Sequence, residues 1–475
     1  MITTPVDDFV RAYADSGIVR AHMPGHKGRG EGPERWDITE MTGADSLYEA
    51  DGIILESEEN AARLFGSGLT CYSAEGSSLS IRAMLLLALR RAQRPGERPW
   101  LLAGRNAHRT LLSAAALLDF DIRWISNAEC GMRSAESDHV IGSNNSEFRI
   151  PNSEFGCGLL SSSMNVSALD EALSRAETLP FAVYLTSPDY LGGVVDIRAA
   201  AEICHAHGVI LLVDNAHGAY LRFLPESRHP LDLGADMCAD SAHKTLPALT
   251  GAGYLHVSKR LADITRADVK AAMSVFASTS PSYLILASLD RCNRLLEREF
   301  PGQLATFARR MDLMKEHLEE AGVVLTGDEP IKLTIRATRA ADGHMIQRLL
   351  QERGIECEMA DPDFVTLMLA PCQLDQMDTI ERPLLDTAGY WAGQPVRIPP
   401  ALPSPGERVM TIREAMLSPQ ETLPLSQCEG RVLASDTTGC PPAVPIAVCG
   451  ERLTEETIEL CRYYGLKTLR VAKLR

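Results

Sequence analysis

Short apolar runs alternate with longer amphipathic stretches along most of the chain before residue 280. Such runs predict buried strands, and apolar residues at helical spacing predict helices. The expected strands lie at 69–72, 100–103, 122–125, 181–186 and 209–213. The expected helices lie at 6–15, 54–65, 77–91, 107–118 and 198–207. This alternation predicts an α/β fold with a mostly parallel sheet and helices on both of its faces.

The pattern changes after about residue 280. Long amphipathic helices are expected at 284–300 and 304–320, and strands at 331–337 and 364–369. These features predict a smaller α+β domain. A chain of 475 residues also exceeds what one hydrophobic core usually supports, so more than one domain is expected.

These patterns together predict the domain organisation. We expect an N-terminal segment over 1–50, a large ligand-binding domain over 51–283 and a small C-terminal domain over 284–475. Residues 127–165 interrupt the large domain with a composition rich in Ser, Asn, Gly and Glu. This composition lacks apolar periodicity, so we expect an inserted, mobile surface loop there.

Polar residues follow the expected strands of the large domain. Asp214 comes directly after the apolar run 209–213, and Ser187 follows the strand 181–186. The loop 73–78 follows the first expected strand. Ligands of parallel α/β sheets bind outside the carboxyl ends of the strands. The sequence therefore predicts a binding site at this edge of the sheet.

Lys244 and Asp214 suggest the chemistry of that site. Lys244 lies in Ser241-Ala-His-Lys-Thr245, which follows Asp214 after a further expected helix and strand. A lysine that forms a Schiff base and a carboxylate that pairs with a protonated pyridine nitrogen are what pyridoxal 5′-phosphate requires. A solvated lysine and a capping aspartate are the plainer alternatives. The apolar stretch after Lys244 favours the functional interpretation, because burying an unpaired ammonium is costly.

A second group of residues suits the phosphate and the ring of this cofactor. Gly76, Ser77 and Ser78 open the expected helix 77–91, and free N–H groups at a helix N-terminus attract anions. A serine that merely caps the helix is the alternative. Further candidates are Ser241 for the phosphate, His217 and His243 beside the ring, His108 stacked on it, and Ser187 at the strand end.

Composition narrows the classes of partner. The formal charge of −16 argues against nucleic acid or an anionic membrane and is compatible with a cationic substrate. The 12 cysteines are scattered, which favours free thiols in a reducing cytoplasm. His22 and His26 lack a further ligand at suitable spacing, so no metal site is expected. No secretory signal or membrane-spanning run is seen, and we expect a cytoplasmic protein.

With these residues in hand, the chain resembles the Orn/Lys/Arg decarboxylases, which are pyridoxal phosphate enzymes of fold type I. No receiver-like domain precedes the first matching motif, as in the short form of the family. The matching segments run in the family's order: Ala21-His-Met-Pro-Gly-His-Lys-Gly28, Asp37-Ile-Thr-Glu40, Arg105-Asn-Ala-His108, Val213-Asp-Asn-Ala-His-Gly218, Ser241-Ala-His-Lys-Thr-Leu-Pro-Ala-Leu-Thr250 and Pro441-Pro-Ala-Val-Pro-Ile446.

The chain departs from the family's usual pattern at a few positions. Glu75-Gly76 stands where the family usually has Asn-Gly. Asp189 and Asn215 stand where it usually has Thr and Glu. These departures leave Lys244 and Asp214 in place.

The resemblance implies that a basic L-amino acid (arginine, lysine or ornithine) is decarboxylated to its amine in polyamine metabolism. It assigns Lys244 to the Schiff base, Asp214 to the pyridine nitrogen and His108 to ring stacking, with Gly76, Ser77, Ser241 and His243 around the phosphate and the reacting centre. It also implies a homodimer or larger assembly with sites at subunit interfaces. We expect Lys244 or His243 to return the proton, and Glu40 and Asp45 are candidates for binding the distal cation. An aminotransferase, another lyase and a degenerate pyridoxal-phosphate-binding regulatory protein remain alternatives on the same fold.

Overall fold

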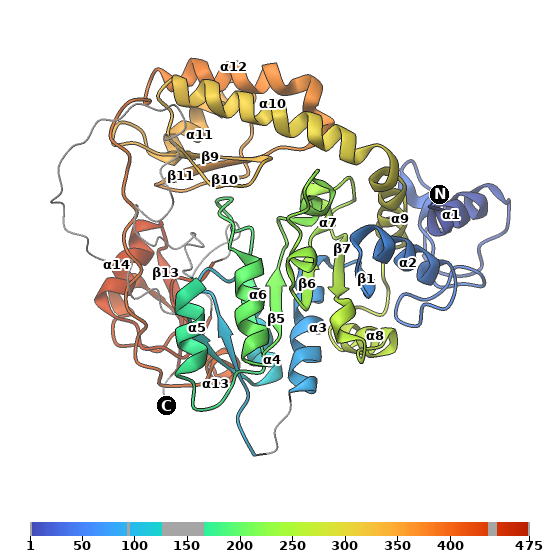
Figure 1. Ribbon diagram of the computed structural model, residues 1–475, viewed down its shortest axis with the longest axis horizontal. Coiled ribbons are helices and arrows are strands. Elements are labelled where there is room, and N and C mark those ends of the chain that lie inside the picture. The colour runs from blue at the N-terminus through green and yellow to red at the C-terminus, as the bar shows by residue number, and fades with distance from the viewer. Residues whose placement is uncertain (1, 93–95, 126–165, 436–443, 474–475) are drawn as a thin grey trace. The chain divides into compact units, whose positions relative to one another are not determined.

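The computed structural model describes residues 2–92, 96–125, 166–435 and 444–473. The expected loop 127–165 and the start of the motif 441–446 lie outside these ranges. Figure 1 shows the helices and strands of the chain, which divides into two compact units. The first contains Met1–Leu102, Glu177–Ser187 and Asp196–Ala305, and the second contains Ala103–Ala176, Pro188–Val195 and Thr306–Arg475.

The large sheet has seven strands in the order β1-β7-β6-β5-β4-β2-β3. Strand β4 runs parallel to β5 and β5 to β6, whereas β7 runs antiparallel to both β6 and β1. The predicted α/β class is therefore confirmed. The strands are β1 (Leu69–Ser73), β2 (Trp100–Ala103), β3 (Asp121–Trp124), β4 (Val183–Thr186), β5 (Leu211–Asp214), β6 (Met237–Asp240) and β7 (Gly253–Val257).

Except for α8, which was not predicted, the long helices of the first unit appear close to where the sequence predicts them. Helix α3 contacts β6 and β7 and is buried along nearly all its length, which explains its uniform run of Leu and Ala. Helix α2 ends at Gly66, whose φ of 69° is a left-handed conformation that favours glycine. The helices are α1 (Pro5–Asp15), α2 (Ile53–Phe65), α3 (Gly76–Arg91), α6 (Ile197–Ala206), α8 (Arg266–Ser274) and α9 (Tyr283–Arg298).

Asp290 on α9 caps the N-terminus of α1. Its Oδ2 accepts the backbone N–H groups of Val6 (2.8 Å) and Asp7 (2.9 Å), and its Oδ1 accepts the hydroxyl of Ser57 (2.5 Å). Burial raises the pKa of Asp290 to about 6. The first helix is thus held by a carboxylate that lies far along the chain.

The segment between β5 and Lys244 differs from expectation. A helix is expected before the next strand, but the chain forms two short 3-10 turns, η3 (Ala219–Phe223) and η4 (Pro230–Leu233), before β6. Strand β7 is not predicted at all, because an antiparallel strand inserted beside β6 breaks the strand–helix alternation on which the prediction rests. This strand is nevertheless buried throughout.

The second unit contains an antiparallel sheet in the order β10-β11-β9-β8 and a two-stranded sheet of β12 and β13. The expected strands 331–337 and 364–369 correspond to β9 and β11. Its strands are β8 (Leu325–Thr326), β9 (Lys332–Arg336), β10 (Met359–Ala360), β11 (Phe364–Met368), β12 (Gln420–Pro424) and β13 (Thr468–Ala472). Its helices are α4 (Thr110–Leu118), α5 (Val166–Ser174), α11 (Gly343–Gln351), α12 (Met377–Ala388), α13 (Ile412–Leu417) and α14 (Glu455–Tyr463).

Helix α10 (Phe300–Glu320) starts in the first unit and continues into the second. Across the described part of the chain, no helix combines the length and the apolarity that crossing a bilayer requires.

Candidate active site

Lys244 lies on a single helical turn, α7 (Ala242–Thr245), directly after β6. Its Nζ lies 2.9 Å from Nε2 of His217. His217 is buried in the turn that follows β5. Two of the residues predicted from sequence therefore meet across the ends of neighbouring parallel strands.

Asp214 ends β5 and is 2% exposed. The hydroxyl of Tyr184 donates a hydrogen bond to its Oδ2 (3.0 Å), and the backbone N–H of Ala216 donates to its Oδ1 (3.2 Å). Burial raises the pKa of Asp214, while the charge of Lys244 and these two donors act in the opposite direction. A buried carboxylate is the group that pairs with a protonated pyridine nitrogen, and the amine of Lys244 is the group that could form the Schiff base.

Tyr184 is a functional candidate that the sequence analysis missed. Burial, followed by the charge of Asp214, raises the pKa of this phenol well above its ordinary value. The hydroxyl therefore stays protonated and remains a donor to Asp214. A tyrosine in the middle of the apolar run 181–186 is the only sequence signal for this role, and it is a weak one.

The N-terminus of the 16-residue helix α3 forms a polar edge of the site. The hydroxyl of Ser241 donates to that of Ser77 (2.8 Å), which joins the start of α3 to the segment that carries Lys244. Gly76 has a φ of 69°, and its N–H donates to the carbonyl of Gly251 (2.7 Å). Ser78 belongs to the same first turn. This end of the site offers hydroxyls and the N-terminus of a helix, which suit a phosphate.

His243 and Ser187 also lie in this region. Nδ1 of His243 is 2.8 Å from the carbonyl oxygen of Ala252. Burial, and then the charge of Lys244, lower the pKa of His243, which favours the neutral imidazole. The backbone N–H of Ser187 donates to the carbonyl of Asp214 (3.1 Å) and fixes the end of β4 against β5.

Two buried hydroxyls near the strand ends have no hydrogen-bond partner among the described residues. They are Oγ1 of Thr186, which pairs in register with Asp214, and Oγ1 of Thr245, which follows Lys244. A bound polar group would satisfy such atoms, whose burial is otherwise unfavourable. Together with the serine pair and the Lys244–Asp214 combination, they fit pyridoxal phosphate.

Glu75, the acidic residue in the loop before α3, forms its hydrogen bond with a residue outside this loop. Oε1 of Glu75 accepts the backbone N–H of Ser278 (2.7 Å). This contact gives the carboxylate a partner in the segment before α9. Asp189, in the second unit, accepts the N–H of Gly193 (2.7 Å) within its own turn.

Glu40 and Asp45 make contacts within their own part of the first unit. The carboxylate of Asp45 accepts backbone N–H groups of Ser46, Asp51, Gly52 and Ile54, which holds the loop before α2. Oε1 of Glu40 accepts the hydroxyl of Ser46 (3.3 Å). Their role toward a substrate stays a prediction.

His108 belongs to the second unit, just before α4. Its Nδ1 lies 2.8 Å from the hydroxyl of Thr110 and accepts the N–H of the same residue (3.2 Å). The proposed stacking of this ring on a cofactor stays a prediction.

Gly253 allows the closest backbone approach in the site. A Cβ atom at this position would lie 2.9 Å from the carbonyl carbon of Gly76, 3.1 Å from the nitrogen of Ser77 and 3.0 Å from the carbonyl oxygen of Asp240. These contacts are too short for any side chain. The glycine therefore sets the spacing between β7, the end of β6 and the start of α3.

We expect Gly253→Ala to push α3 away from Ser241 and to weaken cofactor binding more than folding. Overpacking of this kind costs about 1–3 kcal/mol of stability. The measurement is pyridoxal phosphate affinity together with thermal unfolding. The control is Gly302→Ala in α10, where an added Cβ meets nothing within 4 Å and stability should rise by up to about 1 kcal/mol. Unchanged affinity in Gly253→Ala would contradict this account.

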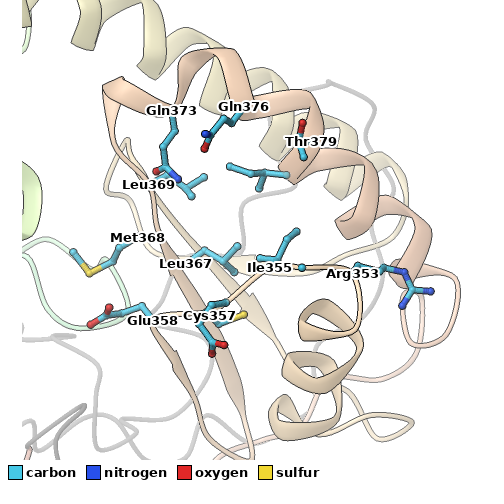
Figure 2. A pocket seen from close by; sticks show the side chains of 13 residues that line it. Arg353, Ile355, Cys357, Glu358, Leu367, Met368, Leu369, Gln373, Gln376 and Thr379 are labelled. Carbon is cyan, nitrogen blue, oxygen red and sulfur yellow. The ribbon is translucent and has the colours of Figure 1, made fainter.

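A separate pocket lies in the second unit (Figure 2). It is lined by residues 353–358, by the end of β11 and by residues between Gln373 and Ile380. Its walls combine Arg353, Glu356 and Glu358 with aliphatic side chains. None of the predicted site residues lines it.

Comparisons with known proteins show the family to which this chain is related. The family model for the major domain of Orn/Lys/Arg decarboxylases matches residues 4–308, and the model for their C-terminal domain matches 400–473. An arginine decarboxylase of Halalkalibacterium halodurans is 29% identical over 97% of this chain and 93% of its own length.

Solved structures show the same fold. The constitutive lysine decarboxylase of E. coli superposes with a TM-score of 0.72 at 19% identity, covering 99% of this chain and 82% of that one. The structure of SPT with PLP internal aldimine gives a TM-score of 0.53 at 14% identity, covering 82% and 85%. The predicted fold type I class is thereby confirmed. Because the major-domain model alone matches more than half of the sequence, the chain belongs to the Orn/Lys/Arg decarboxylase family.

Proposed function

We propose that this protein decarboxylates a basic L-amino acid to its amine and carbon dioxide, with pyridoxal phosphate as cofactor and arginine as the first substrate to test. The observation that carries the proposal is that Lys244 contacts His217 at the ends of neighbouring parallel strands, where its charge also acts on the buried carboxylate of Asp214, in a member of a decarboxylase family. Arginine comes before lysine and ornithine because the Halalkalibacterium relative bears that name.

Different residues of the chain would hold different parts of the cofactor. Lys244 would hold its aldehyde carbon, Asp214 its ring nitrogen, and Ser77, Ser241 and the first turn of α3 its phosphate, with His108 on the ring face. When bound, the cofactor accepts the electron pair that the substrate's Cα–carboxylate bond releases. Tyr184 keeps the Asp214 carboxylate oriented through its hydrogen bond.

Lys244 and the histidines beside it would move the proton. Nζ of Lys244 is in hydrogen-bonding distance of Nε2 of His217, so a proton can be held between these two nitrogens. Lys244, or His243 in its protonated form, would then deliver a proton to the substrate's Cα. Asp214 itself is buried, and the low polarity around it strengthens its contacts with Tyr184 and Ala216.

The proposed activity also bears on how the substrate is bound, how the protein assembles and where it acts. An acidic protein with a formal charge of −16 suits a cationic substrate, and Glu40 is the acidic side chain we propose first for the distal cation. We also propose a homodimer or larger homo-oligomer that acts in cytoplasmic polyamine metabolism, without nucleic acid or membrane partners.

The test is a panel of L-arginine, L-lysine and L-ornithine, with carbon dioxide release and the amine product measured for each. We expect release from arginine without any keto-acid acceptor. Amino transfer to a keto acid without carbon dioxide would indicate an aminotransferase instead. A bound cofactor with no turnover of any basic amino acid would indicate a regulatory protein.

A further inference from the structure

A fully buried polar cluster lies behind the candidate site. Asp240, the last residue of β6, is completely buried together with His229 and His256. Its Oδ2 lies 3.1 Å from Nε2 of His229 and 3.3 Å from Nε2 of His256. Its Oδ1 accepts a hydrogen bond from the side-chain amide of Asn215 (2.7 Å). The cluster thus reaches the residue directly after Asp214.

The carboxylate of Asp240 is held in its charged form. An isolated carboxyl group at this depth would be neutral, because burial disfavours the charge. Here the two imidazoles hold the pKa of Asp240 below its ordinary value despite burial. A permanent acceptor therefore faces the amide of Asn215.

The bond between Asn215 and Asp240 joins the two segments that carry the cofactor-binding groups. Asn215 directly follows Asp214, and Asp240 begins the run that leads through Ser241 to Lys244. A backbone hydrogen bond from Asn215 N to Ala239 O (3.0 Å) fixes the same junction. Any shift at this junction moves the Asp214 carboxylate relative to the Lys244 amine.

Stability alone does not explain why these charged groups are buried. Apolar side chains of similar volume usually stabilise a core at least as well as a buried ionic network. The charge of Asp240 also raises the pKa of Asp214, which works against the role proposed for Asp214.

We propose that Asp240, held by His229 and His256, is a positioning residue that acts through Asn215 to fix Asp214 against Lys244. This inference rests on the proposed function, because it concerns the same cofactor site. It assigns a role to Asn215, which stands where the family resemblance leads one to expect Glu.

Affinity of the apo-protein for pyridoxal phosphate tests the inference, with turnover as a second readout. Asn215→Asp places two carboxylates face to face, and we expect about 10- to 100-fold weaker cofactor binding, as for other residues that orient a binding group. Adding Asp240→Asn restores the pairing of one carboxylate with one amide. This double variant should return to within about three-fold of wild-type affinity, and the loss in turnover should lie in kcat rather than in substrate KM.

The chain supplies a matched control on the same strand segment. Asp236 precedes β6 and is also buried, and its Oδ2 contacts Nε2 of His205 (2.9 Å) and accepts the N–H of Leu211 (2.8 Å). The substitution Asp236→Asn removes a comparable buried charge, and the side chain at position 236 does not contact Asn215. It should not rescue Asn215→Asp. Equal rescue by both second substitutions, or rescue by neither, would overturn the inference.

Asn215→Leu is a second test variant in case Asn215→Asp does not fold. It removes the amide without adding a charge. We expect about 10-fold weaker cofactor binding, and wild-type affinity would overturn the inference. Sγ of Cys238 lies 3.9 Å from Nε2 of His229, so zinc content is measured as well. One zinc ion per chain that Cys238→Ser removes would make Asp240 a ligand and overturn the inference.

The outcomes separate this inference from the proposed function. A wild-type protein that binds pyridoxal phosphate and releases carbon dioxide, with Asn215 variants that bind normally, refutes only the role of Asp240. A wild-type protein that binds no pyridoxal phosphate refutes both.

Discussion

Replacement of Lys244 by alanine is expected to abolish the visible absorption of the bound cofactor and to lower turnover by at least about four orders of magnitude. The reason is that Nζ of Lys244 would both attach the cofactor and move the proton at Cα. An absorption spectrum of the purified variant and carbon dioxide release from arginine measure the two effects.

Lys259→Ala is a suitable control, since this lysine is exposed on the short turn η5 (Lys259–Leu261). It should leave both the spectrum and the turnover unchanged. A normal visible band in Lys244→Ala would show that another amine attaches the cofactor, and the site would have to be assigned elsewhere.

Asp214→Asn is expected to lower kcat by about 1,000-fold and to weaken pyridoxal phosphate binding. Asparagine keeps the shape of the side chain, and its oxygen can still accept the Tyr184 hydroxyl. The variant lacks the negative charge that keeps the ring nitrogen protonated. Because the side chain is buried, water cannot compensate for the missing charge. Steady-state kinetics and a cofactor titration provide the measurements.

The control for this variant is Asp236→Asn, which also neutralises a buried carboxylate that contacts a histidine. Its effect should appear in thermal stability and not in kcat. If Asp214→Asn kept wild-type turnover, the pyridine nitrogen would have no need of an anion, and the proposed role of Asp214 would be wrong.

The sequence predicted the parts of the fold whose periodicity is unambiguous. Helix α3 and strand β5 appear close to the expected ranges, because continuous apolar runs bounded by glycine or aspartate leave few alternatives. Strand β7 was missed because its antiparallel place beside β6 depends on pairing with distant strands. No local pattern records such a pairing.

The candidate site was predicted less completely than the fold. The pairing of Lys244 with His217 follows from the adjacency of the parallel strands β5 and β6, which alternation of elements could suggest. The pairing of Ser77 with Ser241 depends on β7 lying between β1 and β6, and that strand was not predicted. The bond from Tyr184 to Asp214 depends on the register of β4 against β5. The direction of Glu75 toward Ser278 depends on a loop conformation. Neither the register nor the loop conformation can be derived from composition or spacing.

The capping of α1 by Asp290 has a consequence for synthesis on the ribosome. The chain emerges from its N-terminus, so α1 leaves the exit tunnel long before the carboxylate that receives its first N–H groups. Until α9 follows, those donors have only water as a partner. Nascent chains that stop ahead of α9 will therefore carry an undocked first helix, and a truncated gene ending there should yield protein that proteases degrade quickly.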